Sequence, residues 1–194
     1  MMNRQTWFVT GAASHLGADI VRQALAAGHQ VVATDDDALT VLRRLGRVAD
    51  ERLLALGLDA VDTRDVAATV RAAVARFGGI DVLVHGASEA SPQTEFDSPP
   101  PPYDFSASVR ALFNVTRGVL EAMRHQCAGR IVHLVPAPDR QRGPTLFSVA
   151  GFCEAVAADV APFGVEVTAV PAHQAMALLK SVSGSDRDEL LEEA

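Results

Sequence analysis

The chain has 194 residues, of which 48% are hydrophobic and 21% charged, which is enough for one domain with a sizeable core. Its net charge of -7 argues against nonspecific binding to nucleic acid or to anionic membranes, since both attract cations. Cys127 and Cys153 lack the spacing of a disulfide framework or of a metal site, which is typical of a protein in a reducing compartment. No run of about 18 apolar residues predicts a membrane segment. We therefore expect a cytoplasmic protein.

Short β-branched apolar runs alternate with longer helical patterns along the chain. Strands that are almost continuously apolar and separated by helices are typical of a parallel sheet covered on both faces. We therefore expect an α/β fold: a Rossmann-type doubly wound parallel sheet of about six strands, flanked by helices as a three-layer sandwich, in a single domain over 1–194. The expected strands are Thr6–Thr10, Gln30–Thr34, Leu53–Leu58, Val82–His85, Arg130–Val135 and Val165–Val170, and the expected helices are Leu16–Ala27, Ala38–Val48, Thr63–Phe77, Ser106–Arg124 and Thr145–Ala161.

One segment departs from this alternation: "SPQTEFDSPPPPYDF", residues 91–105, whose prolines interrupt helix and sheet alike. Because it follows the fourth expected strand, we expect a surface loop on the ligand side of the sheet, or a connection that the prolines merely stiffen. The chain ends on polar and acidic residues, and we expect 182–194 to be an acidic tail that frays.

The first strand runs into "TGAASHLG", Thr10 to Gly17, a turn of the kind that cradles dinucleotide phosphates. Gly17 lies in the first helical turn, where a missing side chain lets helix and strand pack closely. Asp35 follows the second strand. A carboxylate there accepts hydrogen bonds from both ribose hydroxyls and repels a 2′-phosphate, which favours NAD over NADP. His15 adds bulk where the pyrophosphate would approach, so we expect NAD(H) binding to be weak or lost.

These motifs, in this order, resemble the short-chain dehydrogenase/reductase family over most of the chain. The family's TGxxxGxG turn is similar to "TGAASHLG" and its NNAG to "HGAS", while "FNVTRGVLEAMR", "GRIVHL" and "VAPFGVEVTAVP" are similar to its later tracts. The resemblance implies the Rossmann fold and an adenine contact from Asp59. The cofactor-binding positions that it implies are Thr10, Gly11, His15, Leu16, Gly17, Asp35, Asp59 and Ala87.

Members of that family transfer hydride with an Asn, a Ser and a Tyr-x-x-x-Lys pair, in which the Lys ammonium lowers the pKa of the Tyr phenol. This chain contains a single tyrosine, Tyr103, and a single lysine, Lys180, so the motif cannot occur in it. The chain therefore looks like a degenerate member that lacks the catalytic set. By likeness to the family, Ser108 replaces the Asn, Pro136 the Ser, Phe147 or Arg142 the Tyr, and Gly151 or Leu146 the Lys.

Four histidines, His15, His85, His133 and His173, map to the ligand side of the expected sheet. His85 and His133 fall on the fourth and fifth strands, which would be neighbours, and a pair of imidazoles can transfer protons or bind a metal. They are therefore the speculative catalytic replacements, and chance polar substitution in a relaxed site is the alternative. No Asp, Glu or Cys forms a metal-ligand motif with them in the sequence, so we expect no metal.

The helices over about 106–124 and 145–161 are apolar around much of their circumference, which indicates a second buried face, although both faces can simply be core. The family pairs subunits through these helices, so the resemblance implies a homodimer, or a heterodimer with an active relative. We hypothesise a pseudoenzyme with a structural or regulatory role. Two alternatives stay open: an NAD(H)-dependent oxidoreductase or other enzyme rebuilt around His85 and His133, and an NAD or small-molecule sensor without turnover. We expect no nucleic-acid or membrane partner.

Overall fold

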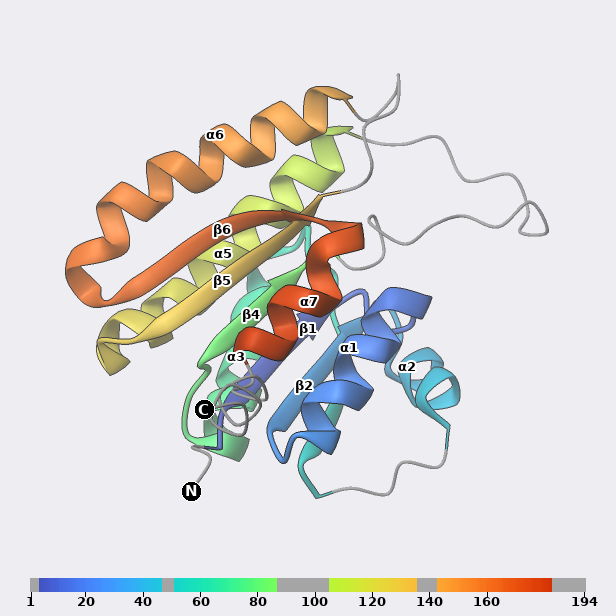
Figure 1. The fold of residues 1–194 in the computed structure, drawn as a ribbon. Helices are drawn as coiled ribbons and strands as arrows, with labels where there is room; N and C mark the ends of the chain where they lie inside the picture. The colour runs from blue at the N-terminus through green and yellow to red at the C-terminus, as the bar shows by residue number, and fades with distance from the viewer. Residues whose placement is uncertain (1–3, 47–50, 87–104, 136–142, 183–194) are drawn as a thin grey trace, which may run out of the picture.

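The computed structural model describes residues 4–46, 51–86, 105–135 and 143–182. Within them, six parallel strands form one sheet in the order β3-β2-β1-β4-β5-β6 (Figure 1). The order reverses between β1 and β4, as expected for a doubly wound sheet whose ligand crevice lies at that point. The strands are β1 (Thr6–Thr10), β2 (Gln30–Asp35), β3 (Leu53–Gly57), β4 (Val82–His85), β5 (Gly129–Val135) and β6 (Val165–Pro171).

Helices cover both faces of the sheet, which confirms the expected three-layer Rossmann-type fold (Figure 1). One apolar cluster lies under α1, α2 and α7, and a second lies under α3, α5 and α6. All five residues of β1 and all four of β4 are buried, because both sides of these central strands face a helix layer. The helices are α1 (His15–Ala26), α2 (Ala38–Leu45), α3 (Thr63–Phe77), α5 (Phe105–Gln126), α6 (Gly143–Val160), the 3₁₀ turn η1 (Ala161–Phe163) and α7 (Ala172–Val182).

The strands expected from the sequence are confirmed within two residues at either end, and β1 and β4 have the expected bounds. Helix α2 ends earlier than expected, at Leu45, because Gly46 turns the backbone into the left-handed region with a φ of 75°. Helix α7 was not expected: it follows β6 directly and packs on β5 and β6.

Two expectations about loops fall largely outside the described residues: the proline-rich segment over 91–104 and the tail over 183–194. Helix α5 begins at Phe105, the last residue of the proline-rich segment. In the part of the chain that is described, no helix combines the length and the apolar character needed to cross a bilayer.

Candidate functional site

The nucleotide turn is held together by its own backbone, and Gly17 is required for it. Ser14 caps α1 by accepting a hydrogen bond from the Gly17 N–H at 3.0 Å, while its hydroxyl donates to the Gly11 carbonyl at 2.8 Å. Gly17 is thereby pressed against the turn: a Cβ there would overlap the Gly11 carbonyl oxygen and lie 2.9 Å from the Ala12 Cα. The expected close packing of helix on strand at Gly17 is therefore present.

Three successive N–H groups of this turn already have partners. Ala12 donates to the Thr34 carbonyl at 3.0 Å, Ala13 to the Asp35 carboxylate at 3.0 Å, and Ser14 to the Gly11 carbonyl at 3.1 Å. Asp35 also accepts from the Asp36 N–H, so both of its carboxylate oxygens are engaged by backbone. These donors would have to exchange partners before the turn bonded a phosphate.

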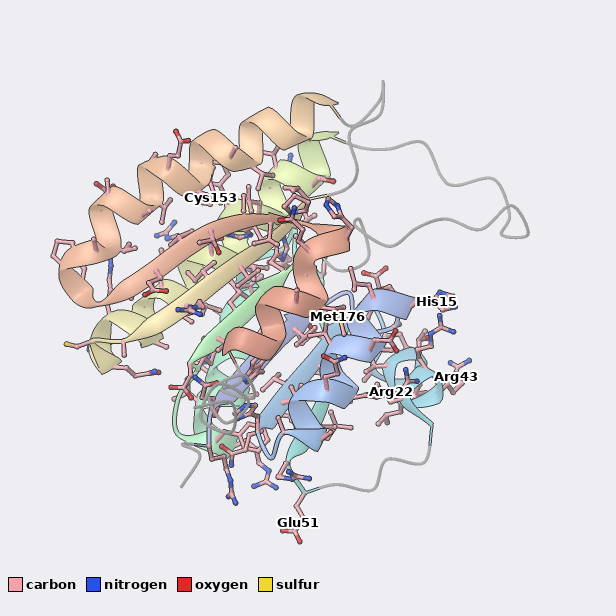
Figure 2. The ribbon with its side chains drawn as sticks, viewed as in Figure 1. His15, Arg22, Arg43, Glu51, Cys153 and Met176 are labelled. Carbon is pink, nitrogen blue, oxygen red and sulfur yellow. The ribbon has the colours of Figure 1, made fainter. Side chains whose placement is uncertain are left out.

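The other expected cofactor positions differ in their exposure to solvent. His15 begins α1 and is exposed, at the outer end of that helix (Figure 2). Leu16 is half-buried against the apolar cluster beneath α1. Ala87 lies outside the described residues. The structure thus brings the turn and the end of β2 together, as the sequence predicted, and leaves the NNAG-like segment beyond Gly86 undescribed.

The rim beside the turn is acidic. Asp36 follows β2, and its pKa is raised first by partial burial and then by the negative charges of Asp35 and Asp59. Asp59 accepts from the Val61 N–H, and its own N–H donates to Asp65 at 2.6 Å. Three carboxylates near one another repel any further anion, which supports the expected discrimination against a 2′-phosphate.

His85 and His133 are brought together by the strand register, as the sequence predicted. They are paired residues on neighbouring strands β4 and β5, and both side chains face the layer of α5 and α6. Their rings meet edge to face, with centroids 5.5 Å apart. Thr10 and His85 Nδ1 form a hydrogen bond of 2.9 Å, and Thr116 and His133 Nε2 form one of 3.1 Å.

Burial keeps this pair uncharged at neutral pH. Burial lowers the pKa of His85 from 6.5 to about 4. Burial also lowers the pKa of His133 well below its usual value, with a smaller effect from the nearby His85. The Nδ1 atom of His133 is buried, and no described residue forms a hydrogen bond with it. An imidazole in this state is a poor proton donor near pH 7, because almost none of it is protonated.

Ser108, the residue at the family's Asn position, lies on α5 and lines a small cavity with His85, Gly86 and His133. The cavity is about 10 Å³, the space of a single water molecule. Among the described residues, polar groups of Ser108, His85 and His133 thus surround a space of about one water molecule.

The remaining positions of the family's catalytic set are only partly visible. Gly151 lies on α6, exposed, with no atom within 4 Å of where a Cβ would stand. Pro136 and Arg142 lie outside the described residues. Leu146 and Phe147 belong to α6, and their side chains are not among those described. The structure therefore brings Ser108 to the histidine pair and leaves open which residues stand at the Tyr and Lys positions.

The hydroxyl partners of the two histidines were not predicted from the sequence. Thr10 was expected only as a cofactor position and Thr116 was not named, and 75 residues separate Thr10 from its partner His85. His173, by contrast, is exposed at the start of α7 and contacts Gln174. Among the described residues, no three His, Cys, Asp or Glu side chains gather as metal ligands.

A second concave surface lies over α5, α6 and η1, on the outside of the fold. This groove has a volume of about 720 Å³. Phe113, on α5, is 52% exposed and packs on Phe152 of α6, with ring centroids 4.5 Å apart. The residues that line this groove, called the helix groove below, are Phe113, Thr116, Arg117, Leu120, Glu121, Arg124, His125, Phe152, Val156 and Phe163.

Comparison with known proteins points to one family. The family model described as short chain dehydrogenase matches residues 5–175. Oxidoreductase BOA17 of Botryotinia fuckeliana is 30% identical over 84% of this chain, and 2-(R)-hydroxypropyl-CoM dehydrogenase of Xanthobacter autotrophicus is 34% identical over 84%. The chain spans 62% and 71% of the length of these two relatives.

Solved structures agree with the sequence comparison. The crystal structure of 3-ketoacyl-(acyl-carrier-protein) reductase from Brucella melitensis, complexed with NADH, is similar with a TM-score of 0.69. It is 25% identical, and the match covers 87% of this chain and 75% of that one. The shared scaffold of that enzyme is therefore one on which a nicotinamide dinucleotide binds.

Proposed function

Because the chain belongs to the short-chain dehydrogenase family, we propose that it is a catalytically degenerate member, a structural or regulatory subunit that pairs with a second copy of itself. The loss of catalysis is inferred from the numbers of tyrosines and lysines in the chain. Tyr103 is the only tyrosine and Lys180 the only lysine, so Tyr-x-x-x-Lys cannot be assembled. Without the adjacent ammonium, a phenol titrates near pH 10 and exchanges its proton poorly at neutral pH.

The histidine pair does not replace that chemistry. His85 and His133 are buried and neutral, and the cavity beside them holds about one water molecule. Their hydrogen bonds to Thr10 and Thr116 fix them as part of the packed layer between sheet and helices. The geometry thus favours a polar core over the alternative of an oxidoreductase rebuilt on these residues.

For the nucleotide turn we propose weak NAD(H) binding or none. Family membership and an NADH-bound structural relative support a dinucleotide-binding scaffold. Two features of this chain weaken binding of the dinucleotide. His15 replaces a glycine and adds bulk, and the N–H groups of Ala12, Ala13 and Ser14 already donate to groups within the protein. Any residual preference is for NAD over NADP, since Asp35, Asp36 and Asp59 make the rim acidic.

The helix groove supports pairing with a second copy. It combines aromatic side chains, Phe113 and Phe152, with both signs of charge on α5, Arg117 and Glu121. A two-fold axis that crosses α5 between Arg117 and Glu121 would place each arginine near the partner's glutamate and would bury aromatic surface of both copies, which makes this face suited to self-pairing. An exposed aromatic patch with a charged rim is typical of protein interfaces.

Both cysteines support a reducing location. Cys127 is exposed and Cys153 buried, and both are free thiols. Burial raises the pKa of Cys153 to about 11, so this thiol stays protonated and unreactive. Free thiols fit the cytoplasm that we propose for the protein.

Replacing Phe113 with glutamate is expected to turn a dimer into a monomer. The substitution places two charges opposite each other across a two-fold interface and removes the aromatic contact with Phe152. Because the side chain is half exposed, the folded monomer should lose only about 1 kcal/mol, the value of the aromatic contact. Sedimentation velocity over a range of concentrations measures the change, and we expect at least about a 100-fold weaker association, roughly 2.7 kcal/mol.

Leu39→Glu is the matched control. Leu39 is 62% exposed on α2, on the opposite layer of the sheet, so this variant should associate like the wild type. A wild-type chain that sediments as a monomer, or a Phe113→Glu dimer of unchanged affinity, would reject pairing through the helix groove.

A further inference from the structure

The floor of the helix groove is built on a buried polar contact. His133 lies at the centre of β5, and Ile131 and Val135 on the same side of this strand are apolar and buried. An imidazole is therefore inserted into an otherwise apolar row. Its Nδ1 is buried without a partner, which costs free energy that an aliphatic side chain would not incur.

The imidazole contacts two residues that also line the helix groove. Its Nε2 and the Thr116 hydroxyl form a hydrogen bond of 3.1 Å, which ties β5 to α5. Its edge meets the ring of Phe152 on α6, with centroids 6.0 Å apart and planes at 70°. Thr116 and Phe152 both line the groove, so one side chain of the sheet reaches both helices of the proposed interface from below.

His133 is itself held in place from the other side. His85 meets it edge to face, and the hydroxyl of Thr10 fixes His85 at 2.9 Å while accepting the Gly86 N–H at 3.2 Å. On the groove side, Phe152 packs on the exposed ring of Phe113 at 4.5 Å. A continuous set of contacts therefore runs from the end of β1, beside the nucleotide turn, to the aromatic pair in the groove.

We infer that His133 is the positioning residue of the pairing surface: its contacts with Thr116 and Phe152 set how α5 and α6 present the Phe113–Phe152 pair to a second copy of the chain. This inference rests on the proposed pairing through the helix groove. An aliphatic residue fills the space of the imidazole, yet it lacks a ring edge to orient Phe152 and a nitrogen to hold Thr116.

The test separates positioning from simple stabilisation by means of two single variants and their combination. His133→Leu leaves the Thr116 hydroxyl without its imidazole partner, and Thr116→Val leaves the imidazole without its hydroxyl. Thr116→Val should lower the melting temperature, because the buried imidazole loses its hydrogen bond to the hydroxyl. His133→Leu should lower it less, because removing the unpartnered Nδ1 offsets part of the cost of the unpaired Thr116 hydroxyl. The double variant removes both polar groups together, so its melting temperature should recover most of the loss.

Association of the wild type, the two single variants and the double variant is measured by sedimentation velocity. We expect the double variant to pair at least about tenfold more weakly than the wild type although its stability is restored, because Phe152 has lost the ring beneath it. Val9→Ala is the matched control: Val9 is fully buried in the other apolar cluster, so this variant should lose stability and keep the wild-type affinity.

Each outcome decides between the proposals. Recovery of wild-type affinity in the double variant, together with its stability, would overturn the positioning role and leave pairing through the groove intact. A wild-type monomer, or a dimer insensitive to Phe113→Glu, would overturn the pairing itself and His133's role with it.

Discussion

Alanine at position 17 is expected to destabilise the folded chain by about 3 kcal/mol, the upper range for overpacking a close contact. The added methyl group would overlap the Gly11 carbonyl oxygen and lie 2.8 Å from the Gly11 carbonyl carbon and 2.9 Å from the Ala12 Cα. These are backbone atoms of a turn fixed by hydrogen bonds to Ser14, so no side-chain rotation relieves the overlap. Urea unfolding followed by circular dichroism measures the loss as a lower midpoint.

Gly151→Ala is the matched glycine control. Gly151 lies in the middle of α6, and in the described part of the chain nothing stands within 4 Å of where its Cβ would be. Alanine there should stabilise the helix by up to about 1 kcal/mol, because glycine is the weaker helix former. Equal effects of the two substitutions would show that the contact between α1 and the nucleotide turn is not tight, contrary to the structure.

Lowering the pH from 7 to 5 is expected to cost about 2 kcal/mol of unfolding free energy through His85 alone. Burial lowers the pKa of His85 from 6.5 to about 4 in the folded chain, so the unfolded chain binds the proton first as the pH falls. Stability is therefore complete above the unfolded pKa of 6.5 and is lost progressively as the pH approaches 4. His133, whose pKa is also lowered by burial, adds a loss in the same direction.

Urea unfolding at a series of pH values measures how steeply the free energy of unfolding declines with falling pH. Variants then show which histidines cause this slope. A His85→Asn, His133→Leu double variant should show a clearly shallower decline between pH 7 and 5. His173→Asn, at an exposed histidine on α7 that lies outside the helix groove, is the matched control for the substitution itself. Among the described residues, those that contact the pair or line its cavity, including Thr10, Ser108 and Thr116, carry no charge of their own to change the slope. An undiminished slope in the double variant would contradict the neutral buried pair.

Much of the fold follows from sequence because its signals are local. The apolar runs of β1 and β4 stop at Thr10 and His85, where turn residues begin, and their bounds were predicted correctly. Helix α7 was missed because "AHQAMALLKSV" follows β6 without an intervening turn, and its start has no side-chain cap of the usual Ser, Thr, Asp or Asn type. Its apolar residues gain a partner only through the packing of α7 on β5 and β6.

The candidate site was predictable only in part. The strand order implied that His85 and His133 would be neighbours, and parallel register places them side by side. Their burial and their hydroxyl partners depend on how α5 lies on the sheet, which no local pattern specifies: Thr116 is 17 residues from His133 along the chain. The same holds for the Phe113–Phe152 pair, because the angle between α5 and α6 decides whether these rings meet.

We propose that the dinucleotide turn is retained as part of the scaffold while its capacity for catalysis is lost. Calorimetric titration of the purified chain with NADH, and with NADPH as the comparison, is the first measurement to make. We expect no saturable heat with NADH, or a Kd weaker than about 1 mM, which is outside the usual range for enzyme substrates. NADPH should bind more weakly still, because the rim around Asp35 and Asp36 is acidic. Micromolar binding of NADH would contradict this proposal and restore a catalytic or sensing role for the site beside His85.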